Sequence, residues 1–213
     1  MAKLKNKLWM PLRAGDTVEV VAPGFATTDE RVHGAVNFLK QIGLKPRVLQ
    51  DLFGPDVICS NTDEKRLAHL TRALLAKDSQ AIWCLRGGYG ALRIIESVAK
   101  IKKPQTNKLF VGYSDATTLH NYFNQFWHFA TLHGPLLDRL GEHNLPLDQV
   151  NELIEVVFGN RDKVFFNNLQ PLNKWAEKKS NIKSTVVGGN LKVVESHLGT
   201  RFAKSHQGEI LFF

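Results

Sequence analysis

The sequence has little of what marks a secreted, membrane-spanning or zinc-binding protein. It contains two cysteines, Cys59 and Cys84, in 213 residues, too few for a disulfide framework or a four-cysteine zinc site. No apolar run approaches the roughly 20 residues that a membrane helix needs. The lysines near the amino terminus are not followed by the apolar stretch of a secretory signal. We therefore expect a cytoplasmic protein in a reducing compartment, with no membrane partner.

Nucleic-acid-binding motifs are also absent, although the chain is basic. Its formal charge is +8 and its pI is near 9.5, which favours anionic partners in general. The basic residues are dispersed, however, and form only short pairs such as Lys102-Lys103. No RNP-type aromatic strand, helix-turn-helix signature or zinc-finger spacing accompanies them. A nucleic-acid partner would rest on charge alone, so we expect a small anionic substrate instead.

Apolar, β-branched runs alternate with helical periodicity along the first 158 residues. The predicted strands are residues 17–22, 46–49, 80–85, 109–111 and 129–132. The predicted helices are residues 29–42, 63–77, 91–98 and 116–126, with a further one near 150–158. Such alternation predicts an α/β fold, a parallel sheet flanked by helices. Ligands of such sheets bind at the carboxyl ends of the strands.

The composition changes after this region. Residues 160–184 are rich in asparagine and lysine and show no clear period. We therefore divide the chain into an α/β nucleophile domain (1–158), a linker (159–184) and the start of an incomplete carboxy-terminal domain (185–213). About thirty residues are too few for an independent core.

A serine lies on a predicted strand-to-helix turn in the stretch Gly112-Tyr-Ser-Asp-Ala116. Small residues two positions before and after a serine permit the sharp turn that exposes a nucleophile. At a helix amino terminus, the N–H of Asp115 could meet a developing oxyanion. The alternative is that Ser114 or Asp115 merely caps the following helix.

A glycine-rich turn, Arg86-Gly-Gly-Tyr-Gly90, follows another predicted strand. Consecutive glycines allow the backbone to approach a ligand closely and to aim N–H groups at it. A second oxyanion donor of this kind is what acyl transfer requires. The alternatives are a phosphate-binding turn or a purely structural one, but neither G-x-G-x-x-G nor a P-loop lysine is present.

Together with other short motifs, these turns give the sequence a specific resemblance. The motifs, in chain order, are Ala22-Pro23, Arg86-Gly-Gly-Tyr-Gly90, Gly112-Tyr-Ser-Asp115, His133-Gly-Pro135, Gly188-Gly-Asn-Leu191 and Gly199-Thr200. In order and spacing the sequence resembles the LD-carboxypeptidase family, which includes muramoyltetrapeptide carboxypeptidases and microcin self-immunity peptidases. The resemblance spans nearly the whole chain.

The resemblance implies release of a terminal D-alanine from murein tetrapeptides by a serine–histidine–glutamate triad, without metal or cofactor. It makes Ser114 the nucleophile. The backbone N–H groups of Asp115 and Gly88 would form the oxyanion hole. The turn residues expected to contact the muropeptide substrate are Arg86, Gly87 and Tyr89.

The sequence also departs from the family pattern. The family's glutamate follows the strand that matches Gly208-Glu-Ile-Leu-Phe-Phe213, and its histidine lies farther on, so both are missing from the chain as given. The histidines within the chain, such as His120 and His133, read as packing or substrate-shaping residues. We therefore expect the 213-residue chain to be impaired and to self-associate through its apolar last strand. The alternative is a truncated, catalytically impaired remnant or a non-catalytic muropeptide-binding module.

Overall fold

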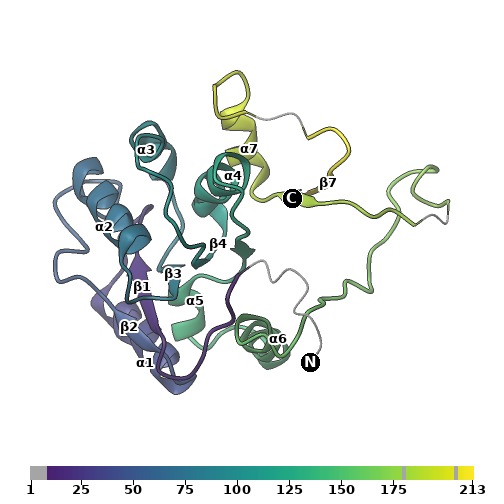
Figure 1. The fold of residues 1–213 in the computed structure, drawn as a ribbon. Coiled ribbons are helices and arrows are strands. Elements are labelled where there is room, and N and C mark those ends of the chain that lie inside the picture. Colours follow the sequence, from purple (N-terminus) through teal and green to yellow (C-terminus); the bar gives the residue numbers. More distant parts are fainter. Residues whose placement is uncertain (1–8, 179–180, 204–205) are drawn as a thin grey trace.

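The computed structural model describes residues 9–178, 181–203 and 206–213. Figure 1 shows a parallel sheet with helices on both faces, and a smaller pair of strands beyond α4. The larger sheet has five strands in the order β2-β1-β3-β4-β5, all parallel. The smaller sheet pairs β6 with β7, also in parallel. The predicted α/β fold with a helix-flanked parallel sheet is therefore confirmed.

Strands and helices alternate along the chain as far as β5, with a longer connection, residues 48–62, between β2 and α2. The strands are β1 Thr17–Val21, β2 Lys45–Arg47, β3 Ala81–Cys84, β4 Leu109–Gly112, β5 Leu132–His133, β6 Val186–Gly188 and β7 Ile210–Phe212. The helices are α1 Asp29–Gln41, α2 Asp63–Leu75, α3 Ala91–Val98, α4 Thr117–Phe126, α5 Leu137–Gly141, α6 Leu147–Val157 and α7 Leu191–His197, with a 3-10 turn, η1, at Ser114–Ala116.

Each face of the large sheet carries its own apolar core. On β3, the side chain of Trp83 packs with α1, α5 and α6, while Ile82 packs with α2, α3 and α4. Because side chains alternate along a strand, a strand covered on both faces reads as one continuous apolar run. That is why the sequence shows no alternation at these strands.

Two details of the sequence prediction are wrong. Residues 129–131 are not part of a strand, because the Phe129 N–H donates to Phe123 O of α4 (3.0 Å) and the Asn124 side chain donates to Phe129 O. Both backbone groups of Phe129 are thus unavailable to a sheet ladder. Helix α5 was not predicted, because its five residues are too few to show helical periodicity.

The carboxy-terminal part packs against α4 instead of standing apart. The N–H of Asn190 donates to Thr117 Oγ1 (2.9 Å), and Gly189 lies so close that a Cβ would come within 2.6 Å of that oxygen. Phe202 is buried beside Tyr122. The division at residues 158 and 184 stays a prediction.

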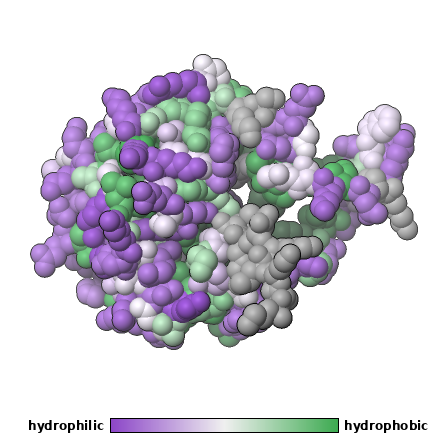
Figure 2. All heavy atoms as spheres, viewed as in Figure 1, coloured by the Kyte–Doolittle hydropathy of each residue, from purple (hydrophilic) through white to green (hydrophobic). Residues whose placement is uncertain are grey.

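Apolar side chains gather on the surface around the 160–178 connection, which projects from the body on the right of Figure 1. Figure 2 shows hydrophilic and hydrophobic residues side by side on the body and on this projection. The exposed side chains there include Phe165, Phe166, Leu169 and Leu172. Within the described part of the chain, every helix is too short or too polar to cross a bilayer.

Candidate active site

The turn between β4 and α4 holds Ser114 in a strained conformation. Its φ is 59°, a left-handed value that costs a non-glycine residue on the order of 1–3 kcal/mol. Gly112 and Ala116 permit the turn: a Cβ at Gly112 would lie 2.9 Å from the Ala116 Cβ and 3.1 Å from the Cys84 Cβ. This is the geometry expected of a serine presented on a strand-to-helix elbow.

The capping alternative is wrong. Neither η1 nor α4 has a side-chain hydrogen bond at its amino-terminal cap. The Asp115 carboxylate instead accepts from the Ala91 N–H of another helix, α3 (2.9 Å), and is buried. Burial raises the pKa of Asp115, and the Ala91 N–H acts in the opposite direction. Ser114 itself is partly exposed.

The structure brings the predicted glycine turn beside this serine. A Cβ at Gly87 would lie 3.1 Å from the Ser114 Cβ and 3.2 Å from its Oγ, so the absence of a side chain leaves this approach open. Gly88 has a φ of 105°, and a Cβ there would overlap the ring of Phe25. Tyr89 is 48% exposed. The ring of Phe25 packs over this turn, a contact that no sequence motif indicated.

Arg86 is engaged within the protein. Its Nη1 donates to Ala26 O (3.2 Å) and Thr27 Oγ1 (3.3 Å), and its Nε lies 4.0 Å from Asp138 Oδ2. Burial raises the pKa of Asp138, and the charge of Arg86 partly offsets this. The guanidinium therefore ties the loop after β1 to the glycine turn, in addition to any contact with substrate.

A buried histidine supports the elbow from behind. His120 Nε2 lies 2.8 Å from Gly112 O, and Nδ1 lies 2.7 Å from Thr131 Oγ1. Burial lowers the pKa of His120 to about 4, so the ring is neutral at pH 7. Since a carbonyl can only accept, Nε2 carries the proton and Nδ1 accepts from the Thr131 hydroxyl. Neither nitrogen is free to take a proton from Ser114.

The other histidine at this edge, His133, is exposed. Its ring centroid is 6.2 Å from that of Tyr113 and 5.9 Å from that of His120. It lines an open hollow of about 270 Å³ with Tyr113, Gly134, Pro135, Arg139 and Leu145. Among the described residues, none makes a side-chain hydrogen bond to Ser114 Oγ.

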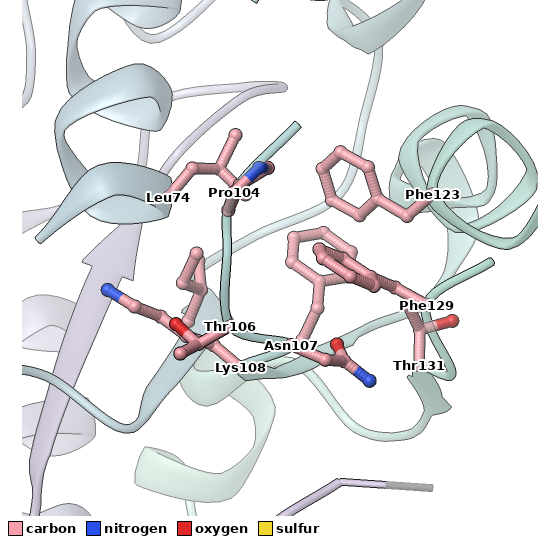
Figure 3. A pocket seen from close by; sticks show the side chains of 10 residues that line it. Leu74, Pro104, Thr106, Asn107, Lys108, Phe123, Phe129 and Thr131 are labelled. Carbon is pink, nitrogen blue, oxygen red and sulfur yellow. The ribbon is translucent and has the colours of Figure 1, made fainter. Parts of the chain in front are cut away.

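A second hollow lies at the opposite, amino end of β4 and is shown in Figure 3. Its volume is about 10 Å³, room for no more than a water molecule. Lys108 lies at its wall, with Nζ donating to Ala73 O and Ser79 Oγ. Its size and its distance along the strand from Ser114 exclude it as a peptide site.

Comparison with known proteins agrees with this geometry. The LD-carboxypeptidase N-terminal domain matches residues 18–134. A Rickettsia prowazekii protein named as a carboxypeptidase is 38% identical to this chain. The match covers 72% of this chain and 48% of that protein. A probable murein peptide carboxypeptidase of Bacillus subtilis is 31% identical over 94% of this chain and 62% of its own length. The chain thus spans about half to two-thirds of such relatives.

Solved structures show the same fold. An MccF-like protein from Bacillus anthracis superimposes with a TM-score of 0.77 at 20% identity, covering 95% of this chain and 68% of that one. A muramoyltetrapeptide carboxypeptidase from Oxalobacter formigenes gives 0.70 at 24% identity, covering 89% and 62%. By its sequence match and its fold, the chain belongs to the LD-carboxypeptidase family.

Proposed function

We propose that this protein contributes the nucleophile half of a serine-type LD-carboxypeptidase that releases terminal D-alanine from murein tetrapeptides. The observation that carries the proposal is Ser114 at a φ of 59°, with the backbone of Gly87 beside its Oγ. Such strain persists where the surrounding structure enforces it, and it is common at catalytic residues. The named substrate is supported by the resemblance to murein peptide carboxypeptidases.

In the proposed reaction, Ser114 Oγ attacks the carbonyl carbon of the last amide bond. The resulting oxyanion would be held by the backbone N–H groups of Asp115 and Gly88. The carbon–nitrogen bond then breaks, D-alanine leaves with the proton that the serine gave up, and water hydrolyses the acyl-serine. The Arg86–Tyr89 turn would contact the substrate.

No described side chain is hydrogen-bonded to Ser114 Oγ as a proton acceptor. His120 is occupied by Gly112 and Thr131, and His133 makes no hydrogen bond to Ser114. We propose that the acceptor is the family's histidine, oriented by the family's glutamate. The resemblance places both of them after the strand that matches residues 208–213. The two cysteines are buried free thiols, which suits murein recycling in the reducing cytoplasm.

The test compares Ser114→Ala with the unchanged protein in a form that includes the family's glutamate and histidine. D-alanine release from a murein tetrapeptide should fall by several orders of magnitude, with an unchanged circular dichroism spectrum. Ser97→Ala, on α3, is the matched control. Unchanged turnover in Ser114→Ala would refute the assignment. Binding without turnover in the parent protein would favour a muropeptide-binding module.

A further inference from the structure

The side chain of Asp115 lies where three strand ends meet. It follows β4, it is 4% exposed, and its Oδ2 accepts from Ala91 N, which begins α3 after the glycine turn. A Cβ at Gly24, just after β1, would lie 2.9 Å from the same oxygen and 2.4 Å from Gly87 O. The ends of β1, β3 and β4 are therefore packed around one carboxylate.

Helix α3 depends on this carboxylate for its amino-terminal hydrogen bond. Its cap residue is Gly90, which has no side chain and a φ of 147°. The first N–H groups of a helix need acceptors from outside it, and here Asp115 supplies one from a different strand. An anion is also the favoured partner at this end of a helix.

A buried arginine reinforces the same turn. Arg66 is 2% exposed and donates through Nη1 to Pro23 O, and a Cβ at Gly90 would lie 2.6 Å from Nη1. Cys59 donates to the neighbouring Tyr89 O at 3.4 Å. These contacts fix the turn at Tyr89–Ala91. At its other end, Gly87 O accepts from the Phe25 N–H (2.9 Å), and Gly87 lies beside Ser114.

We propose that the Asp115 carboxylate is a positioning residue for catalysis, fixing Gly90 and Ala91 so that the Gly87–Gly88 backbone is held beside Ser114. This role differs from that of the Asp115 backbone N–H, and it rests on the function proposed above. Displacement of a catalytic group by about 1 Å can lower turnover about 100-fold. A single carboxylate would therefore couple the nucleophile's turn to the turn that carries the second oxyanion donor.

The test has two arms with separate readouts. Amide hydrogen exchange at Ala91 is followed in the 213-residue chain, and kcat and KM for D-alanine release are measured in the form with the family's glutamate and histidine. Asp115→Ala should speed exchange at Ala91 at least tenfold and lower kcat about 100-fold, with KM within about threefold. Asp115→Asn keeps an acceptor oxygen and should recover most of both losses.

Leu119→Ala is the control, because Leu119 is fully buried in the core on α4. It should lower the melting temperature without a selective effect at Ala91 or on kcat. Unchanged exchange at Ala91 in Asp115→Ala, or a kcat within threefold of the parent at equal folded fraction, would overturn the proposal. If Asp115→Ala does not fold, Asp115→Leu, which keeps the branching of the side chain but has no acceptor oxygen, decides by the same two readouts.

The two arms also separate this proposal from the function on which it rests. If the parent protein releases no D-alanine, the proposed function fails. In that case the exchange measurement alone decides whether Asp115 holds the turn.

Discussion

Gly112 and Ala116 face each other across the serine turn, and a Cβ on Gly112 would lie 2.9 Å from the Ala116 Cβ. The same Cβ would also meet Cys84 of the neighbouring strand at 3.1 Å. The sharp turn that exposes Ser114 therefore depends on the lack of a side chain at residue 112.

Gly112→Ala should destabilise the protein by about 1–3 kcal/mol, because the added methyl overpacks a well-filled interior. The measurement is the free energy of unfolding in urea. Gly134→Ala is the control, since its Cβ would have no neighbour closer than 3.5 Å, and it should change that free energy by less than about 1 kcal/mol. Equal effects of the two substitutions would contradict this explanation of the turn.

The stability of the protein should fall as the pH drops through the range from about 6.5 to 4. Burial lowers the pKa of His120 to about 4 in the folded protein, from 6.5. Between these pH values His120 is protonated in the unfolded chain and neutral in the folded protein. The free energy of unfolding therefore falls by up to about 3 kcal/mol across this range. The measurement is the free energy of unfolding as a function of pH.

His120→Gln should flatten this dependence, because glutamine does not titrate while its amide can still donate to Gly112 O. The exposed His33 on α1 provides the control, His33→Gln. A pH dependence that is the same in His120→Gln as in the parent would show that other groups cause it.

Arg86 and Asp138 should be coupled in stability. Arg86→Met leaves the Asp138 carboxylate buried with less compensation, and Asp138→Asn removes that charge. In a double-mutant cycle we expect a coupling energy of about 1 kcal/mol, modest because Arg86 is partly exposed and 4.0 Å away. The free energies of unfolding of the four proteins test this. A coupling near zero would mean that the charge of Arg86 does not stabilise the buried Asp138 carboxylate.

The 213-residue chain should self-associate through β7. Ile210, Leu211 and Phe212 are 37%, 50% and 44% exposed, and an apolar edge strand invites pairing with another copy. Light scattering over a range of concentrations tests this, and Leu211→Lys should shift the protein toward monomer. Lys174→Glu, in the exposed connection, is the control. A concentration-independent monomer would contradict the prediction.

Local patterns made the fold largely predictable. The helix at residues 91–98 was predicted with the bounds of α3, because Ile94, Ile95 and Val98 recur at helical spacing directly after Gly90. The serine turn was predictable for the same reason, since the small residues that permit it, Gly112 and Ala116, lie within one five-residue stretch.

The sequence could not indicate the contacts between the ends of separate strands. The bond from Ala91 N to Asp115 joins residues 24 positions apart, and it arises only when β3 and β4 pair side by side. β-Propensity predicts a strand at residues 129–131, but the Asn124 side chain of α4 donates a hydrogen bond to Phe129 O, which a neighbouring strand would otherwise use. Whether such a segment forms a strand depends on residues that are distant in sequence or on a neighbouring helix, and a local sequence pattern does not include them.

The attachment of Asn190 to Thr117 has a consequence for proteolysis. The connection at residues 160–178 is exposed throughout, and exposed connections of this kind are preferred cleavage sites. A protease that cuts there would produce two pieces. Phe202 remains buried beside Tyr122, and His197 lies against Thr118. The nicked protein should therefore stay together as a complex. Its smaller piece would still be bound through Asn190 to Thr117, three residues after Ser114 in the sequence.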